Sequence, residues 1–99
     1  MLNQVVLVGR ISGPIELELD GNCTITLKVI KSTKNSNNEY DSDYIDVTLT
    51  GDVAQKMRDH CKEDDLVGVK GSLRKIKNDF RMTVEAEKIT FLSGTKGGE

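Results

Sequence analysis

The chain has 99 residues, a formal net charge of −2 at pH 7, 36% hydrophobic residues and 4% aromatic residues. This length fits one domain with a modest core, and the net charge argues against a protein that wraps nucleic acid with its whole surface, although it leaves room for one basic face. No apolar stretch approaches the roughly 20 residues of a membrane span, and no signal peptide is evident, so we expect a cytoplasmic protein with no membrane partner.

An almost uninterrupted apolar run opens the chain and predicts a first strand over residues 2–11. A strand that is apolar on both faces requires cover on both, and a second copy of the same chain is the simplest cover for the outer face. Gly9, inside the run, predicts a bulge or a sharp bend. We therefore expect a homo-oligomer, with an interface that includes Leu2, Gln4, Val6 and Val8.

Turn residues and alternation divide the part of the chain that follows. Residues 13–14 (Gly-Pro) predict a break, after which residues 15–19 alternate as a short continuation. The Asp-Gly-Asn sequence at residues 20–22 predicts a turn, and residues 23–31 then alternate as a second strand. The polar, turn-rich residues 32–43 predict a mobile loop.

One helical pattern lies between the strand patterns of the second half. Residues 44–51 alternate as a third strand. Asp52 is a candidate N-cap for a helix of about two to three turns that carries Val53, Met57 and Cys61 on one face. A helix at this place in the order is unusual in a β-sandwich or an SH3-like barrel.

Two further strands are predicted over residues 66–77 and 80–92, joined by a tight turn at residues 78–79. Residues 93–99 have nothing to pack against and predict a flexible tail. The order of three strands, a helix and two strands matches the OB-fold, an all-β Greek-key barrel of five strands with one short helix between strands three and four. Residues 1–92 are the expected domain.

Few residues suggest catalysis or metal binding. Cys23 and Cys61 are far apart in the chain, and His60 is the one histidine, so the four ligands of a zinc site are missing. Neither a carboxylate pair nor a Gly-rich phosphate loop is evident. We therefore expect no enzyme, no metal and no cofactor, and we expect both thiols to be buried and inert.

Four segments carry a family resemblance. They are Met-Leu-Asn-Gln-Val-Val-Leu-Val-Gly-Arg at 1–10, Tyr-Ile-Asp-Val-Thr-Leu at 44–49, Leu-Val-Gly-Val-Lys-Gly-Ser-Leu at 66–73 and Ala-Glu-Lys-Ile-Thr-Phe-Leu at 86–92. In this order they resemble the bacterial single-stranded DNA-binding protein family over nearly the whole chain. The resemblance implies an OB-fold homodimer or homotetramer that binds single-stranded DNA without sequence preference, in replication, recombination or repair.

The family binds DNA with a basic groove and stacking aromatic rings, and the charge of this chain is segregated accordingly. Basic residues are concentrated between residues 70 and 81, whereas acids gather at residues 16–20 and 63–65. A second interpretation is that the strand lysines protect sheet edges against aggregation. The residues expected to hold phosphates are Arg10, Lys28, Lys31, Lys34, Lys70, Arg74, Lys75, Lys77 and Arg81.

The aromatic residues depart from the family pattern. The resemblance places Tyr44 and Phe80 at stacking positions, whereas the other stacking positions hold Asn35, Thr50 and Asn78. Tyr44 faces outward by the alternation of its strand, while Phe80 shares the phase of core candidates and fits the core equally well. With so few rings, we expect DNA binding that rests mainly on charge and weakens steeply with salt.

Two further departures concern the protein's partners. The tight turn at residues 78–79 replaces a long DNA-contacting loop of the family. The chain ends without the acidic-hydrophobic tip that recruits replication enzymes, so we expect no tip-mediated recruitment. An alternative function is an OB-fold protein-interaction subunit that has lost DNA binding.

Overall fold

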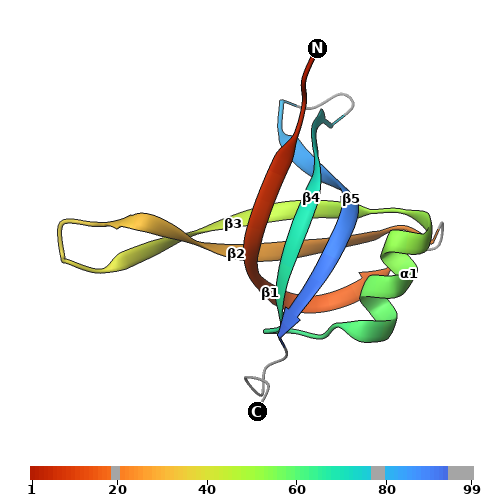
Figure 1. Cartoon of the computed structure of the whole chain (residues 1–99), viewed down its shortest axis with the longest axis horizontal. Coiled ribbons are helices and arrows are strands. Elements are labelled where there is room, and N and C mark those ends of the chain that lie inside the picture. Colours follow the sequence, from red (N-terminus) through yellow and green to blue (C-terminus); the bar gives the residue numbers. More distant parts are fainter. Residues whose placement is uncertain (19–20, 77–79, 94–99) are drawn as a thin grey trace.

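A computed structural model of the chain describes residues 1–18, 21–76 and 80–93. The elements are β1 (Val5–Leu17), β2 (Cys23–Lys34), β3 (Tyr40–Leu49), α1 (Gly51–His60), β4 (Leu66–Lys75) and β5 (Met82–Ser93). The strands close into a barrel in the order β1-β2-β3-β5-β4, with β3 and β5 parallel and the other pairs antiparallel (Figure 1). The predicted OB-fold is therefore confirmed, as is the helix between the third and fourth strands.

Alternation along the strands fills the barrel with apolar side chains. Ile25 of β2 lies opposite Val47 of β3, and Leu27 lies two residues further along the same inner face, each with 2% or less of its surface exposed. Helix α1 adds Met57, which is fully buried in the same cluster. Burial of a side chain of this size contributes about 1.5–3 kcal/mol to stability. The hydrophobic pattern thus predicted which strand faces make the core.

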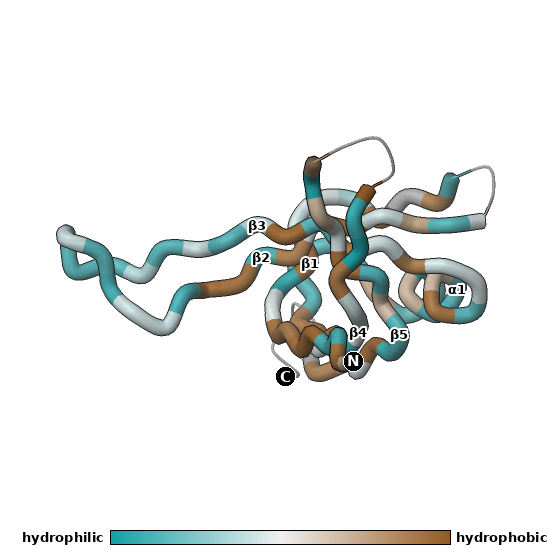
Figure 2. Tube along the Cα trace, turned by 90° about the horizontal axis from the view of Figure 1, so that it is seen from above, coloured by the Kyte–Doolittle hydropathy of each residue, from teal (hydrophilic) through white to brown (hydrophobic). Residues whose placement is uncertain are grey.

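The prediction of a mobile loop over residues 32–43 is wrong, because most of this segment forms strands. β2 and β3 continue past the barrel as a two-stranded arm (residues 30–43) that is mostly hydrophilic or neutral toward its tip (Figures 1 and 2). Asn35 stabilises the turn at the tip, since its Oδ1 accepts from the backbone N–H groups of Asn37 and Glu39 at 2.8 and 3.0 Å. Hydrogen bonds between the two main chains keep such a ribbon together even though it has no apolar face. The hydrophobic pattern of the sequence therefore did not predict these strands.

The first strand also differs from its prediction. β1 begins at Val5 instead of residue 2, and it runs through Pro14 as one strand with a register shift against β2 in that region. A bulge leaves a position unpaired, which suits a residue that has no backbone N–H to donate. Ahead of β1, the Asn3 side chain exchanges two hydrogen bonds of 2.9 Å with the Leu73 main chain, so residue 3 is still tied to β4.

The helix begins two residues earlier than predicted. Its N-cap is Thr50 rather than Asp52, which lies in the first turn, where a negative charge is favourable to the helix dipole. Val53 and Cys61 are half-buried and Met57 is fully buried, so the predicted apolar face is confirmed. No helix within the described residues is long and apolar enough to cross a membrane.

Two glycines allow backbones to meet where the barrel closes. A Cβ on Gly9 of β1 would overlap the Lys28 carbonyl oxygen, and one on Gly71 of β4 would overlap the Glu85 carbonyl oxygen. Of the bulge or sharp bend predicted at Gly9, the bulge is wrong, because β1 pairs regularly with β4 through this residue. A register shift lies instead between β4 and β5 beside Gly71. Because both neighbours are main chain, no change of rotamer could make room for a side chain.

We predict that Gly71→Ala destabilises the protein by about 1–3 kcal/mol or more, because the added methyl group forces the β4 and β5 backbones apart. Urea unfolding followed by circular dichroism measures the change. Gly68→Ala on the same strand is the matched control, since its Cβ would lie 3.7 Å from the Thr90 Cβ, an ordinary contact. Equal stability of the two variants would contradict the prediction.

Candidate nucleic-acid interface

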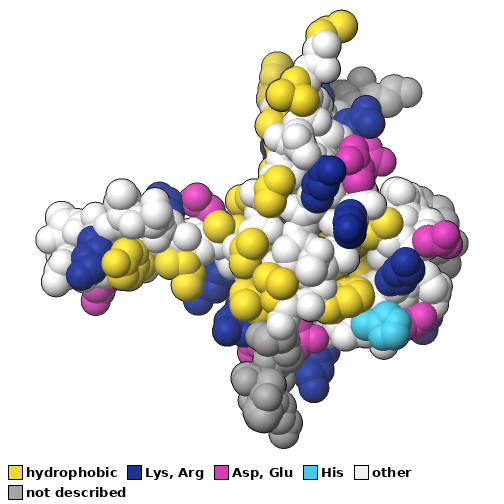
Figure 3. All heavy atoms as spheres, viewed as in Figure 1, with side chains coloured by type: hydrophobic (Ala, Val, Ile, Leu, Met, Phe, Trp, Pro, Cys, Tyr) yellow, Lys and Arg dark blue, Asp and Glu magenta, His cyan; other side chains and the backbone are white. Residues whose placement is uncertain are grey.

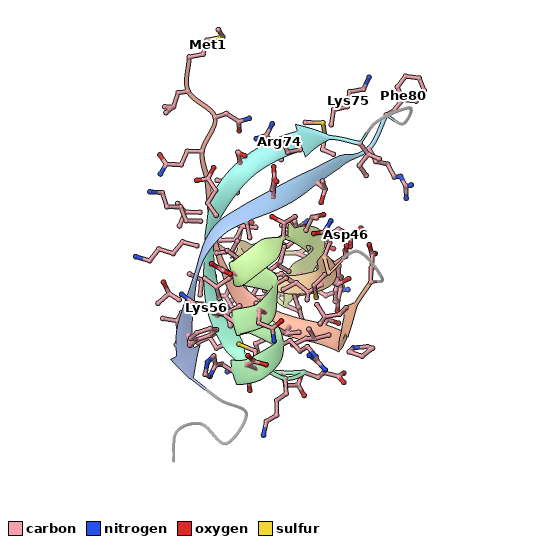
Figure 4. The ribbon with its side chains drawn as sticks, turned by 90° about the vertical axis from the view of Figure 1, so that its right-hand side faces the viewer. Met1, Asp46, Lys56, Arg74, Lys75 and Phe80 are labelled. Atoms are coloured by element: carbon pink, nitrogen blue, oxygen red, sulfur yellow. The ribbon has the colours of Figure 1, made fainter. Side chains whose placement is uncertain are left out.

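A groove lies where β3 passes beside the end of the β4–β5 hairpin. It encloses about 390 Å³ and is lined by Tyr44, Ile45, Asp46, Leu73, Arg81, Met82, Thr83 and Val84. The hairpin end rises above the barrel, with Phe80 and Lys75 near its tip and Asp46 below it (Figure 4). The lining combines one aromatic ring, exposed aliphatic side chains and one charge of each sign, so it can contact both the face and the edge of a planar ligand.

Tyr44 stands at the base of the arm with its ring outward. It pairs with Lys28 of β2 in register, and 61% of its surface is exposed. The alternation of β3 that buries Val47 and Leu49 turns Tyr44 to the opposite side. The predicted stacking ring and one predicted phosphate contact are thus neighbours beside the groove.

The described end of the β4–β5 hairpin carries Arg74, Lys75 and Phe80 of the predicted residues, next to Arg81. Phe80 is 97% exposed, so the reading that placed its ring in the core is wrong. Arg74 donates from Nε to a Glu85 carboxylate oxygen at 2.8 Å, and both side chains remain substantially exposed. Lys75 is exposed beside them. The hairpin end therefore presents an aromatic ring together with positive charge.

The two predicted lysines of the arm each have a local partner. The Lys31 Nζ lies 3.7 Å from an Asp43 carboxylate oxygen. The Lys34 Nζ lies 5.5 Å from the centroid of the Tyr40 ring, a cation–π contact. Exposed contacts of this kind are worth at most about 1 kcal/mol, so both ammonium groups can exchange their partners for a phosphate.

The structure does not bring all the predicted basic residues together. Arg10 donates from Nη1 to the Asp64 carbonyl oxygen at 2.9 Å, in the connection that follows α1. Lys70 lies opposite Val6 of β1 and so stands on the outer face of the β1–β4–β5 sheet. Lys77 falls outside the described residues. The groove itself is flanked by Lys28 and lined by Arg81.

The four predicted interface residues are all exposed. Val6 and Val8 of β1 are 68% and 52% exposed, and Leu2 and Gln4 are exposed ahead of the strand. Leu92 of β5 is also exposed, and a cluster of apolar side chains covers this part of the β1–β4–β5 face (Figure 3). The apolar surface faces away from the core, as the unalternating sequence of the strand predicted.

Of the eight described residues that line the groove, sequence reasoning predicted a binding role for Tyr44 and Arg81 only. By alternation, Asp46 was expected on the outer face of its strand, with no role. Met82 shared the phase of core candidates but is 54% exposed, and Leu73 was noted only as part of the family-like segment at residues 66–73. The outward phase of Asp46, two residues after Tyr44, was the available signal. The positions of Leu73 and Met82 depend on how the hairpin bends over β3, which a strand pattern does not contain.

The thiols are held in their unreactive form. Cys23 is buried in the core, and burial together with the Asp65 charge raises the pKa of the Cys61 thiol to about 11. With this raised pKa, the Cys61 thiol stays protonated at neutral pH. It is therefore a poor nucleophile, because the thiolate is the reactive form. The His60 ring packs against Phe91 with centroids 5.7 Å apart, and the described residues contain no cluster of three or more potential metal ligands.

Comparison with known proteins assigns the family. The model of the "Single-strand binding protein family" matches residues 2–92. The chain is 35% identical to "Single-stranded DNA-binding protein 1" of Clostridium acetobutylicum, over 74% of this chain and 71% of that protein. It is 34% identical to "Single-stranded DNA-binding protein A" of Bacillus subtilis, over 99% of this chain and 63% of that protein.

A solved structure agrees with the fold. The barrel superposes with a TM-score of 0.69 on the crystal structure of a small single-stranded DNA binding protein from Mycoplasma pneumoniae, at 24% sequence identity over 90% of this chain and 92% of that one. This structural similarity shows the fold alone, whereas the family model and the sequence relatives show which family the chain belongs to. On those sequence matches, the chain belongs to the single-strand binding protein family.

Proposed function

We propose that this chain binds single-stranded DNA along a path from the arm, across the groove, to the end of the β4–β5 hairpin, without requiring a defined sequence. The observation that carries the proposal is the exposed Tyr44 ring beside Lys28, in a groove that Arg81 also lines. A ring beside cations suits a strand whose bases stack while its phosphates meet positive charge. The protein would serve replication, recombination or repair by shielding the strand, with no covalent step.

Two aromatic rings supply stacking at separate points of the path. Tyr44 lies at the base of the arm and Phe80 near the tip of the hairpin, and both are exposed. Each base that stacks on a ring contributes about 1–3 kcal/mol. Two rings leave most of the affinity to phosphate contacts, for which we propose Lys28, Lys31, Lys34, Arg74, Lys75 and Arg81. The family assignment gives no support to the alternative of a subunit that has lost DNA binding.

We also propose that a second copy of the chain covers the outer face of β1. Val6 and Val8 point outward from a strand whose inner side chains already pack on the core, and Leu92 extends the same surface. Apolar surface of this kind gains free energy when another surface removes it from water. A dimer and a tetramer are both compatible with this face.

Tyr44→Ala should weaken binding to a fluorescent poly-dT oligonucleotide by about 1–3 kcal/mol, because one stacking platform is lost. Fluorescence anisotropy titrations at two salt concentrations measure the affinity. Tyr44→Phe keeps the ring and should bind as the unchanged protein does. If the alanine variant binds equally well, Tyr44 is not part of the path.

Lys75→Gln should reduce the slope of log K against log salt by roughly 0.7, because one phosphate contact and its released counterion are removed. The same titrations, repeated over a series of salt concentrations, give the slope. Lys56→Gln is the matched control, since Lys56 lies on α1, away from the hairpin end (Figure 4). Identical slopes for the two variants would exclude the hairpin end from the binding path.

Val6→Asp should shift the protein toward monomers at micromolar concentration, because association would have to remove water from the introduced carboxylate in an otherwise apolar interface. Sedimentation velocity reports the distribution of species. Ile30→Asp is the control, since Ile30 is 64% exposed on the arm, close to the 68% of Val6, but lies outside the proposed interface. A monomeric unchanged protein, or an assembly that tolerates the Val6 change, would contradict the interface.

A further inference from the structure

Asp46 places a negative charge inside the groove proposed to hold DNA. It follows Tyr44 by two residues on β3, so both side chains project from the same face of the strand, and both line the groove. A carboxylate on a phosphate path repels the backbone and weakens binding to every sequence. Its position among exposed apolar side chains suggests a partner other than phosphate.

The carboxylate has capacity left for a ligand. Oδ1 accepts from the Thr26 hydroxyl at 3.3 Å, across the β2–β3 pair in which these two residues are opposite each other. Within the described residues, the Asp46 side chain makes no other hydrogen bond or ion pair. An ionised carboxylate has about four acceptor sites on two oxygens, so most of them remain open while Thr26 steadies the group.

The hydroxyl of Thr83, which lines the groove from β5, is already engaged. The Thr83 hydroxyl donates to the Asp46 carbonyl oxygen at 3.2 Å and lies 3.2 Å from the Thr48 hydroxyl, which can donate to it. This network ties β5 to β3 at the groove floor and leaves little hydrogen-bonding capacity on Thr83. With most of its acceptor sites open, the Asp46 carboxylate is therefore a stronger acceptor than the hydroxyl groups that line the groove.

The apolar lining favours a nucleobase as the ligand that meets Asp46. Leu73 and Met82 are partly exposed opposite the β3 side of the groove, where Tyr44 presents its ring. A base that lies flat against such surfaces buries its faces and directs its edge toward the polar atoms of the groove. Single-stranded bases are commonly recognised in this way, by stacking together with hydrogen bonds to the Watson–Crick edge.

A carboxylate can only accept, so it discriminates among base edges. Guanine presents two adjacent donors, N1–H and the N2 amine, while cytosine and adenine each present one exocyclic amine. Thymine has N3–H between two carbonyl oxygens, which a carboxylate repels. We propose that Asp46 gives this groove a preference for bases with donor edges, guanine above all, over thymine; the proposal rests on DNA binding in the groove as argued above.

Competition between two labelled oligonucleotides tests the preference. One contains thymine only, and the other has the same length with isolated guanines at regular intervals, spaced so that they cannot form quadruplexes. We expect the unchanged protein to bind the guanine-containing strand about fivefold more tightly, the low end for a bidentate contact because the groove is open. Asp46→Asn should reduce this ratio to below about twofold, mainly by strengthening thymine binding, since an amide both donates and accepts.

A matched variant separates base recognition from simple charge removal. Asp43→Asn removes one negative charge from the same strand outside the groove, so it should strengthen both complexes alike and leave the ratio unchanged. Equal affinities for the two strands in the unchanged protein, or an Asp46→Asn variant that strengthens both by the same factor, would overturn the inference and leave DNA binding intact. Failure of both oligonucleotides to bind at low salt would overturn the proposed function itself.

Discussion

Close backbone contact at Gly71 sets the geometry on which the groove depends. The β1–β4 ladder ends with the pair Val5 and Gly71, whereas β4 and β5 stay paired as far as Lys75 and Met82. Beyond Gly71 the hairpin no longer pairs with β1, and the Asn3 side chain contacts it at Leu73 through two hydrogen bonds. The register shift beside this glycine bends the ribbon, and a bulge increases local twist. The hairpin leaves the barrel on the side of β3, and the space beneath it is the groove.

The arm forms in the same way on the other side of the groove: two strands stay paired after a neighbouring strand has ended. Pairing of β2 with β1 ends at Lys28, but β2 and β3 remain paired to Lys34 and Tyr40. Two two-stranded ribbons, the arm and the β4–β5 hairpin, thus extend from the closed barrel, each from the point where a neighbouring strand ends. Tyr44 stands where the arm departs, and Arg81 stands on the ribbon opposite. The residues proposed to bind DNA lie close together there because both ribbons keep their main-chain pairing after they have left the core.

Sequence patterns predicted what depends on burial and missed what depends on pairing alone. Alternation identified the inward faces of β2 and β3 and the outward Tyr44, because apolar burial dominates the energetics of both strands. Alternation did not predict the arm, because its strands lie outside the core and its polar residues are typical of a loop. The burial of Phe80 could not be predicted, because the alternation of inward and outward side chains does not continue beyond the end of a strand. The groove required knowledge of two ribbons that are distant in sequence.

Charge pairing inside the protein limits how strongly its cations can hold DNA. To take the phosphate contacts proposed for them, Arg74 would have to exchange Glu85 for a phosphate and Lys31 would have to release Asp43, so each would gain less than an unpaired cation. Salt weakens these internal pairs as well as the contacts to DNA, which reduces the salt dependence that a simple count of basic residues implies. Lys28 and Lys75 have no ion pair within the described residues. Of the six cations proposed to contact phosphates, Lys28, Lys34 and Lys75 should therefore contribute more per contact than Lys31 and Arg74.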